Sequence, residues 1–398
     1  MKYIAKIISQ IPPSGIRKFF DLVMGMKDVI SLGVGEPDFV TPWNICETAI
    51  HSIEQGYTCY TSNKGMPELR QAICHHLHDQ HKIHYNPDTE ILITVGVSEA
   101  MDLSIRAIIN PGDQVIIPAP SYVSYGPMVT LAGGQPVYIY TSKDNGFKIN
   151  AIDITNACSR KTKAIILNYP VNPTGVSYTK SELEKLKKAI HKNNLLVISD
   201  EIYDELSYDF KHTPWPSLAG AANQCIYLNG FSKAYAMTGW RLGYAAGPRK
   251  IIAAMTKIHQ YTMLCASTPG QVAAIEAIQA GQQSVNQMRE EYRRRRNFVV
   301  SGLQKIGLNC LMPKGAFYVF CPIDITGLDS VEFANRLLKE QKVAVVPGTA
   351  FGSAYNDYIR ISYASSMENL KEALFRISKF IKSGDKKHTI KSSSKTRV

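Results

Sequence analysis

The sequence predicts an α/β protein with a mostly parallel central sheet in a large domain, joined to a smaller α+β domain. Between about residues 90 and 230, short continuous apolar runs alternate with helix-like segments. This alternation is typical of parallel strands that are covered by helices on both faces. After about Asn286 the pattern changes to a charged helix followed by strands and helices in mixed order. The 398 residues are enough for two domains.

The elements of the large domain follow from apolar runs and from the residues that end them. The runs that predict strands are residues 90–95, 114–117, 163–168, 195–199 and 225–228. Helices are expected at 98–109, ended by the turn residues 110–113, and near 180–192. Ligands on parallel sheets bind beyond the carboxyl ends of the strands. Residues that directly follow these runs are therefore candidates for a functional site.

The elements of the smaller domain come mainly from the last part of the chain. Strands are expected at 315–320, 343–346 and 358–363, and helices near 330–341 and 368–381. The predicted domain ranges are 45–285 for the large domain, and 14–44 together with 286–385 for the small one. Residues 1–13 are expected to form an N-terminal arm. Residues 386–398 are rich in Ser and Lys and nearly free of apolar residues, which predicts a disordered basic tail.

The composition is that of a globular protein without a membrane segment. Apolar residues make up 45% and charged residues 20% of the chain. No apolar run approaches the ~20 residues of a membrane helix, and the segment after Met1 lacks the apolar core of a secretory signal. The eight cysteines are scattered, without a Cys-x-x-Cys pair, as is typical of reduced thiols. We expect a cytoplasmic protein with no membrane partner.

The formal net charge of +12 does not require a nucleic-acid partner. Part of the excess lies in the basic tail. The arginine run 293–296 follows two glutamates, and the pairs Glu290/Arg294 and Glu291/Arg295 have the spacing of ion pairs on one helix face. A solvated helix face is therefore expected there, and no nucleic-acid partner.

The residue that points most directly to chemistry is Lys233. It follows Ser232 in an otherwise apolar or small segment, and Arg241 lies eight residues further along. An aldehyde cofactor that carries a phosphate requires this combination, because the amine forms a Schiff base and the guanidinium holds the phosphate. The other candidates that fall just after predicted strands are Val97, Ser98, Asn172, Asp200 and Tyr203.

Together with these residues, five segments make the chain resemble the class I and II aminotransferases, which are fold-type I pyridoxal-phosphate enzymes. The segments are 31–39 (SLGVGEPDF), 172–175 (NPTG), 199–203 (SDEIY), 233–243 (KAYAMTGWRLG) and 358–362 (YIRIS). The resemblance covers about residues 14–381 and is strongest to the subgroup of prokaryotic aspartate, aromatic and N-acetyl-diaminopimelate aminotransferases. It implies the fold-type I architecture and pyridoxal 5'-phosphate as the cofactor.

The resemblance implies a role for each residue around the cofactor ring. Lys233 is expected to form the Schiff base and to move the substrate α-proton, for which a desolvated amine of lowered pKa is suited. Asp200 is expected to keep the ring nitrogen protonated, although an aspartate at a strand end is also a common helix cap. Tyr203 and Asn172 are expected to bind the ring 3-oxygen. Tyr122 is expected to stack on the ring, with ordinary core packing as the alternative.

The cofactor phosphate is expected to be held by Arg241, by the Ser232 hydroxyl and by the backbone amides of Val97 and Ser98. Amides that open a helix form a natural anion cradle, and a guanidinium offers a bidentate contact. Tyr60 matches a family tyrosine that reaches the phosphate of the partner subunit. This match implies a homodimer with shared sites.

The substrate α-carboxylate is expected to bind Arg360, with Gly35 and Asn172 assisting. The apolar neighbours of Arg360 are compatible with a site residue or with a surface residue on the other face of a strand. No second cation for a side-chain carboxylate can be identified. Aspartate-type, aromatic and N-acetyl-diaminopimelate substrates therefore stay open, with the aspartate type favoured. Arg17 is a candidate for a mobile entrance segment.

A histidine-rich stretch follows Cys74. It contains His75, His76, His78, His81 and His84. Zinc binding is conceivable because histidines spaced three apart share a helix face. No second ligand cluster is visible elsewhere in the sequence, so an exposed polar helix is favoured and no metal is expected.

The predicted function is a pyridoxal-phosphate-dependent aminotransferase. It would move an amino group from an L-amino acid to a 2-oxo acid in two half-reactions, by ping-pong chemistry. A carbon–sulfur lyase on the same fold is the alternative enzyme. A cofactor-sensing transcription regulator would need a DNA-binding domain before the enzyme-like part, and the resemblance begins too early, at about residue 14, to leave room for one.

Overall fold

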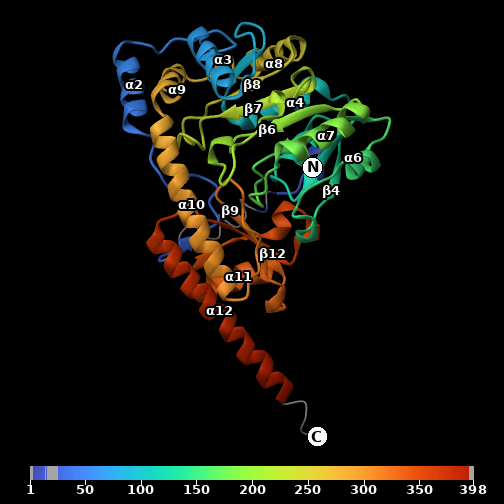
Figure 1. Cartoon of the computed structure of the whole chain (residues 1–398), viewed down its shortest axis with the longest axis vertical. Coiled ribbons are helices and arrows are strands. Elements are labelled where there is room, and N and C mark those ends of the chain that lie inside the picture. The colour runs from blue at the N-terminus through green and yellow to red at the C-terminus, as the bar shows by residue number, and fades with distance from the viewer. Residues whose placement is uncertain (1–2, 14, 16–25, 394–398) are drawn as a thin grey trace.

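The structure, a computed structural model, describes residues 3–13, 15 and 26–393, with the backbone alone for 384–393. The centre of the larger part is a seven-stranded sheet of order β2-β8-β7-β6-β5-β3-β4 (Figure 1). Its strands are β2 Ile91–Thr94, β3 Gln114–Ala119, β4 Gln135–Tyr140, β5 Thr162–Asn168, β6 Leu196–Asp200, β7 Cys225–Gly230 and β8 Gly243–Ala246. Only β8 runs against its two neighbours in this sheet. The predicted, mostly parallel α/β sheet is confirmed.

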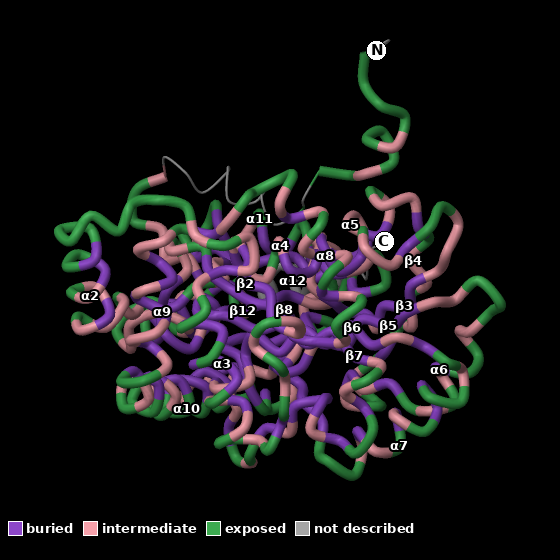
Figure 2. The backbone as a smooth tube through the Cα atoms, turned by 90° about the horizontal axis from the view of Figure 1, so that it is seen from above, coloured by how far each residue is buried: buried purple, intermediate pink, exposed green. Residues whose placement is uncertain are grey.

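Helices cover both faces of the sheet because successive strand residues point to opposite sides. Ile91 and Ile93 belong to one group of core residues, whereas Leu92 belongs to the other. The helices on the first face are α2 Trp43–Glu54, α3 Pro67–His81, α6 Ala151–Ala157, α7 Lys180–Lys192 and α9 Thr268–Ala280. Those on the second face are α4 Gly96–Ile108, α5 Tyr125–Leu131 and α8 Arg249–Thr262. Figure 2 shows the sheet buried between these layers.

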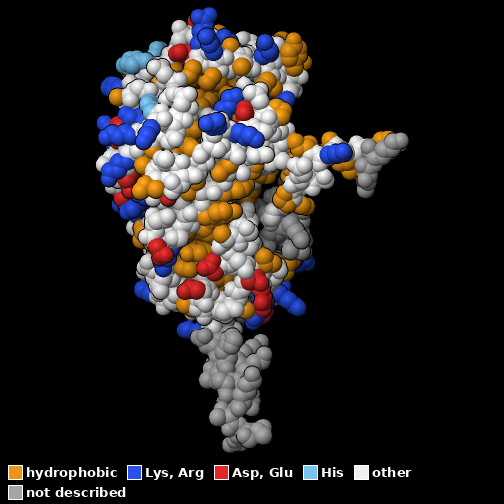
Figure 3. Space-filling view, turned by 90° about the vertical axis from the view of Figure 1, so that its right-hand side faces the viewer, with side chains coloured by type: hydrophobic (Ala, Val, Ile, Leu, Met, Phe, Trp, Pro, Cys, Tyr) orange, Lys and Arg blue, Asp and Glu red, His pale blue; other side chains and the backbone are white. Residues whose placement is uncertain are grey.

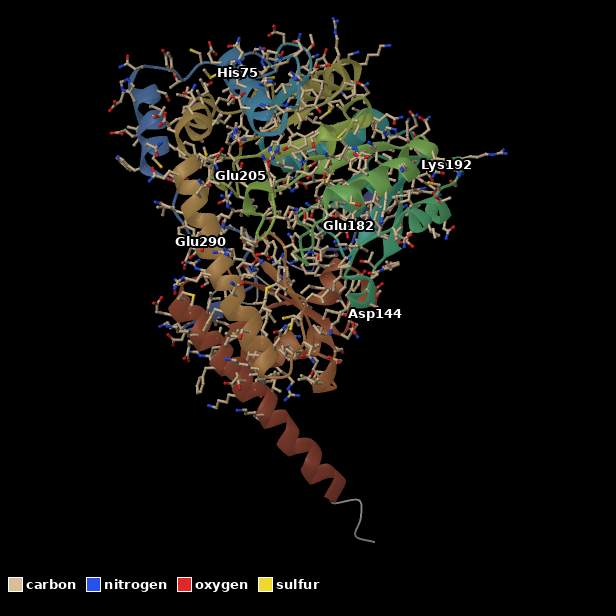
Figure 4. All side chains as sticks on the ribbon, viewed as in Figure 1. His75, Asp144, Glu182, Lys192, Glu205 and Glu290 are labelled. Carbon is tan, nitrogen blue, oxygen red and sulfur yellow. The ribbon has the colours of Figure 1, made fainter. Side chains whose placement is uncertain are left out.

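Helix α7 shows how local sequence sets an element boundary. Thr179 accepts a hydrogen bond from the Glu182 backbone N–H, and the Glu182 side chain accepts one from the Thr179 backbone N–H at 2.7 Å. This reciprocal capping satisfies two N–H groups that the helix itself leaves free. Glu182 marks the start of the helix in Figure 4. The helix covers residues 180–192, as the sequence predicted.

The smaller part contains two further sheets. Strands β9 Tyr318–Pro322, β11 Val346–Pro347 and β12 Tyr358–Ser362 form an antiparallel sheet of order β11-β12-β9, and β1 Ile30–Ser31 pairs in parallel with β10 Val343–Ala344. The predicted strand 343–346 is divided into β10 and β11 because its two halves pair with different strands. The helices are α10 Gln282–Lys305, α11 Ser330–Gln341 and α12 Met367–Ser393.

Short 3-10 helices complete the described elements. They are η1 Lys6–Gln10, η2 Lys143–Asn145, η3 Asp204–Leu206, η4 Trp215–Ser217, η5 Ala222–Gln224, η6 Asp324–Thr326, η7 Gly348–Phe351 and η8 Ser353–Tyr355. Residues 3–13, which include η1, extend from the body (Figure 2), and Figure 3 shows the same segment projecting from one face. Within the described part of the chain, no helix has both the length and the apolar character needed to cross a membrane.

Helix α10 runs from the larger part into the smaller one (Figure 1). Val285 packs in the core of the larger part, whereas Met288, one turn further, packs in the core of the smaller part. The predicted boundary between residues 285 and 286 thus falls inside a continuous helix rather than in a linker. The domain ranges themselves stay a prediction that this division of the core supports.

The disorder predicted for the basic tail 386–398 stays a prediction. Helix α12 continues to Ser393, while residues 394–398 lie outside the described residues. Extending an existing helix adds a hydrogen bond per residue without the cost of a new nucleus. No proline follows Pro347 in the sequence to stop this extension.

The solvated face predicted for α10 is wrong for two of its arginines. Arg295 and Arg296 are buried and pair with carboxylates from distant loops, Asp38 at 2.7 Å and Asp209 at 2.8 Å. The predicted pair with Glu291 forms at 2.8 Å beside the first of these contacts. Helix spacing could not reveal partners that come from other segments.

The exposed turn of the same helix differs in register from the prediction. Glu290, labelled in Figure 4, pairs with Arg293 at 2.7 Å, three residues along, in place of the predicted pair with Arg294. Arg294 pairs instead with Glu291 at 2.8 Å. Spacings of three and four residues both bring side chains together on a helix, so the sequence pattern did not distinguish them.

Candidate active site

A cavity of about 470 Å³ opens where β5, β6 and β7 end and where β9 and β12 of the smaller part approach them. Its walls contain almost every residue that the sequence predicted for the site. These are Gly35, Val97, Ser98, Tyr122, Asn172, Asp200, Tyr203, Ser232, Lys233, Arg241 and Arg360. Segments separated by more than 300 residues in the sequence thus meet around one hollow.

Lys233 lies just beyond β7, a strand that is buried along its whole length. Its Nζ donates a hydrogen bond to the Gly35 carbonyl oxygen at 2.6 Å and lies 5.8 Å from the centre of the Phe317 ring. Burial lowers the pKa of this amine to about 8. Roughly a tenth to a fifth of the amine is therefore neutral, and able to attack an aldehyde, at about pH 7–7.4.

Asp200 is the last residue of β6 and is buried. The Tyr125 hydroxyl donates to its Oδ2 at 2.6 Å, and the Ile202 backbone N–H donates to its Oδ1 at 3.3 Å. Burial raises the pKa of this carboxyl to about 6, while the Tyr125 hydrogen bond acts in the opposite direction. A desolvated carboxylate at this position is suited to a cationic ring nitrogen.

Tyr125 opens α5 and was not among the predicted site residues. Its ring packs edge to face against Tyr122, with centroids 5.7 Å apart. The one signal in the sequence was a second tyrosine three residues after Tyr122. That spacing is too common to single out a residue whose partner, Asp200, is 75 positions away.

Arg360 is buried within β12, which excludes the surface alternative. Its two terminal nitrogens donate to the Asn172 side-chain oxygen at 2.9 Å and to the Gly33 carbonyl oxygen at 2.6 Å. Both acceptors are neutral, and the Arg360 Nε has no partner among the described residues. A buried guanidinium with only neutral partners is a strong binding site for a carboxylate ligand.

An anion cradle lies at the start of α4. Gly96 has φ +76, and a Cβ placed there would lie 2.6 Å from the Arg241 Nη2. Only glycine lets the guanidinium approach the helix end this closely. The free amides of Val97 and Ser98 lie at the same helix end, whose dipole also favours an anion. This arrangement, with the amine and the carboxylate beyond it, fits pyridoxal phosphate.

Tyr203 also lines the cavity, and its hydroxyl is 2.9 Å from that of Tyr318. The position of Asn172 is fixed by a hydrogen bond that its backbone N–H donates to the Asn168 side-chain oxygen at 3.0 Å. Tyr318 and Asn168 also line the cavity and were not predicted. Both residues lie within predicted strands, where a packing role is the default interpretation.

Two predicted residues are not part of this arrangement. Tyr60 is 82% exposed and lies outside the cavity lining of its own chain. This position is compatible with the role predicted for it in a partner subunit, which a single chain does not test. Arg17 lies outside the described residues.

The histidine-rich stretch belongs to α3 and the turn after it, away from the cavity. Figure 4 places His75 on the outer surface of that helix. The rings of His78 and His84 lie 4.7 Å apart, and burial lowers the pKa of His81 to about 4. Across the described residues, no group of three or more His, Cys, Asp or Glu side chains could hold a metal ion.

Comparison with known proteins agrees with the geometry of the cavity. Residues 27–377 match the family model for aminotransferase class I and II. The chain is 46% identical to an aspartate aminotransferase of Pyrococcus abyssi, covering 93% of this chain and 96% of that protein. It is 42% identical to aromatic-amino-acid aminotransferase 2 of Thermococcus litoralis, covering 94% and 97%.

The crystal structure of aspartate aminotransferase from Thermus thermophilus with maleate superposes with a TM-score of 0.91 at 37% identity, covering 95% of this chain and all of that one. Similarity of this extent to the family model, to curated relatives and to a solved structure identifies the family. The chain therefore belongs to the class I and II aminotransferases, pyridoxal-phosphate enzymes that transfer an amino group from an amino acid to a 2-oxo acid.

Proposed function

We propose that this aminotransferase acts on amino acids of the aspartate type and that the residues of the 470 Å³ cavity carry its reaction. The observation that supports this role of the cavity most directly is the position of Lys233. Its amine, with a pKa lowered to about 8, lines the same cavity as the buried carboxyl of Asp200 and the guanidinium of Arg360. The hydrogen-bond acceptors of that guanidinium among the described residues are neutral.

Pyridoxal phosphate supplies an aldehyde and a protonated ring that draws electrons from the substrate Cα. Arg241, Ser232 and the amides that open α4 would hold its phosphate. Asp200 would stabilise the positive charge at the ring nitrogen, and Tyr122 would cover one ring face. The chain's own contribution is thus a fixed position and a fixed electrostatic environment for the ring.

On the substrate side, Arg360 would bind the α-carboxylate with its planar fork, beside Asn172 and the Gly35 backbone. Two fixed points, this carboxylate and the amino nitrogen, orient the Cα–H bond toward Lys233. The neutral Lys233 amine would take the proton from the substrate Cα and deliver a proton to the aldehyde carbon of the cofactor. The second half-reaction, with a 2-oxo acid, uses the same groups in reverse order.

The preference for an acidic substrate is supported by the named relatives, since aspartate aminotransferases are among the proteins to which this chain is 40–46% identical. The charged residues among the described lining add no further support. Arg241 is assigned to the cofactor phosphate, Arg360 to the α-carboxylate and Lys233 to the aldehyde, so none of these three is left for a second carboxylate. We therefore expect a modest preference for a dicarboxylate.

The test is a half-reaction assay on the purified holoenzyme. Aspartate and glutamate should convert the cofactor absorbance faster than alanine or phenylalanine at low salt. A faster reaction with phenylalanine would favour an aromatic aminotransferase, and pyruvate with ammonia from cysteine conjugates would favour the lyase. Borohydride reduction followed by peptide mapping should label Lys233, and Lys233→Ala should remove both label and transfer. Labelling of another lysine would contradict the proposal.

We also propose that the enzyme is a cytoplasmic homodimer. Two adjacent segments carry exposed apolar side chains: Tyr57, Tyr60, Tyr261, Met263 and Leu264. The segments are tied together by the Asn63 side chain, which donates to the Leu264 carbonyl oxygen at 2.8 Å. A contiguous apolar patch next to Tyr60 supports burial by a second copy. Light scattering should give twice the chain mass of 44.2 kDa, and a monomer would contradict it.

A further inference from the structure

Tyr318 is a buried tyrosine in the cavity wall, and none of the roles proposed above belongs to it. Its side chain contacts three of the residues proposed to act there. Its hydroxyl lies 2.9 Å from that of Tyr203, its ring lies 4.4 Å beneath the Arg360 guanidinium, and a Cβ at Gly35 would lie 2.7 Å from its oxygen. One side chain thus joins the proposed cofactor contact to the proposed substrate contact.

The sheet register explains why Tyr318 and Arg360 meet. Strands β9 and β12 are antiparallel, with Phe320 opposite Arg360 and Tyr318 opposite Ser362. Tyr318 and Arg360 are therefore diagonal neighbours on the same face of the sheet, within reach of long side chains. The centre of the Phe351 ring lies 5.1 Å from the guanidinium carbon, so two aromatic rings contact Arg360.

The hydroxyl pair has a direction that the proposed chemistry determines. A phenol has one proton to donate. If Tyr203 donates its proton to the cofactor 3-oxygen, the bond between the two tyrosines must be donated by Tyr318. Such a donation strengthens Tyr203 as a donor, because linked hydrogen bonds polarise one another. It also prevents the Tyr203 O–H from rotating away.

We propose that Tyr318 is a positioning residue that aims the Tyr203 hydroxyl at the cofactor and supports Arg360 at the substrate carboxylate. This inference rests on the proposed roles of Tyr203 and Arg360. It assigns the two functions to different parts of one side chain: the hydroxyl acts on the cofactor through Tyr203, and the ring acts on the substrate through Arg360.

Tyr318→Phe tests the hydroxyl. A hydrogen bond donated to the 3-oxygen draws negative charge from it and so disfavours protonation of the bound cofactor. Weakening that bond should raise the pH midpoint of the cofactor's visible absorbance, by about half to one unit for one hydrogen bond. The KM for the amino acid should stay within about twofold, since the ring remains. In a Tyr203→Phe background the same change should add no shift, because the effect passes through Tyr203.

Tyr318→Leu tests the ring. Loss of the aromatic face under Arg360 should raise the amino-acid KM roughly 3- to 30-fold beyond the effect of Tyr318→Phe, the range of a desolvated cation–π contact. Tyr355→Phe is the matched control, because Tyr355 is equally buried and donates its hydroxyl to the Thr141 carbonyl oxygen at 3.0 Å, outside the cavity lining. It should change neither the midpoint nor the KM. Thermal unfolding of the apo-proteins compares the folds.

The outcomes separate this inference from the proposed function. If the wild-type enzyme is active and Tyr318→Phe has the same absorbance midpoint as Tyr355→Phe, the proposed role of the hydroxyl is overturned. A KM of Tyr318→Leu equal to that of Tyr318→Phe would overturn the role of the ring. A full shift that persists in the Tyr203→Phe background would show that Tyr318 acts by another route. Absence of transamination in the wild type would instead remove the proposed function itself.

Discussion

The hydrogen bond between Tyr125 and Asp200 allows a quantitative prediction for Tyr125→Phe. The tyrosine hydroxyl donates at 2.6 Å to a buried carboxyl whose pKa burial raises to about 6. A hydrogen bond to a charged group contributes about 1.5–3 kcal/mol, which corresponds to about one to two pKa units. The bond stabilises the ionised carboxylate, so its loss should raise the pKa of Asp200 further, to roughly 7–8.

This shift crosses physiological pH and should therefore change the charge of the site. At pH 7 the ionised share of Asp200 should fall from about nine tenths to between about one half and one tenth. The apo-protein is the right sample, because a bound cationic ring would itself lower the pKa of this carboxyl. Infrared titration of the carboxyl C=O band measures the pKa directly, and Asp200→Asn identifies the band by removing it.

The matched control for this experiment is again Tyr355→Phe, which removes a buried hydroxyl that donates to Thr141 and not to Asp200. It should leave the carboxyl titration unchanged. If Tyr125→Phe titrates together with the wild type, the hydroxyl does not hold the charge of Asp200, and burial alone sets its pKa. In the holoenzyme, the variant should bind pyridoxal phosphate more weakly at pH 7 and recover at higher pH, where Asp200 is again ionised.

Three further predictions concern the proposed phosphate cradle, the Lys233 amine and the Arg360 guanidinium. Gly96→Ala should weaken pyridoxal phosphate binding at least about tenfold in equilibrium dialysis. The new Cβ would lie 2.6 Å from the Arg241 Nη2, and the backbone of residue 96 has φ +76, which disfavours alanine. Wild-type affinity would contradict the proposed cradle. In the apo-protein, limited acetylation of Lys233 followed by mass spectrometry should rise with pH around a midpoint of about 8, because the amine is protonated and unreactive below it; a midpoint near that of ordinary lysines would show an amine that is not desolvated. Arg360→Lys should keep the charge but lose the fork, raising the amino-acid KM by roughly 10- to 100-fold with a smaller change in kcat, and an unchanged KM would place the α-carboxylate elsewhere.

Local patterns in the sequence predicted the elements whose signal is strong. Helices α7 and α11 have the predicted residues, and the apolar strands β2, β3, β5, β6 and β7 lie where expected. Strands β4 and β8 were missed for different reasons. The first is partly exposed at the edge of the sheet, and the second, GYAA, consists mostly of small residues. Pairing with a neighbouring strand, which no local pattern reports, determines both.

The sequence by itself predicted the cofactor through its resemblance to the class I and II aminotransferases. It also predicted where the site residues gather, because residues that follow buried strands lie at one edge of a parallel sheet. Lys233, Asp200 and Asn172 could be placed in this way. The tertiary structure alone decided how those groups behave. Burial sets the pKa values of Lys233 and Asp200, and partners distant in sequence, Tyr125 and Tyr318, orient their neighbours. Desolvation and side-chain contact depend on which segments meet in space, and the periodicity of the sequence does not specify which distant segments will meet.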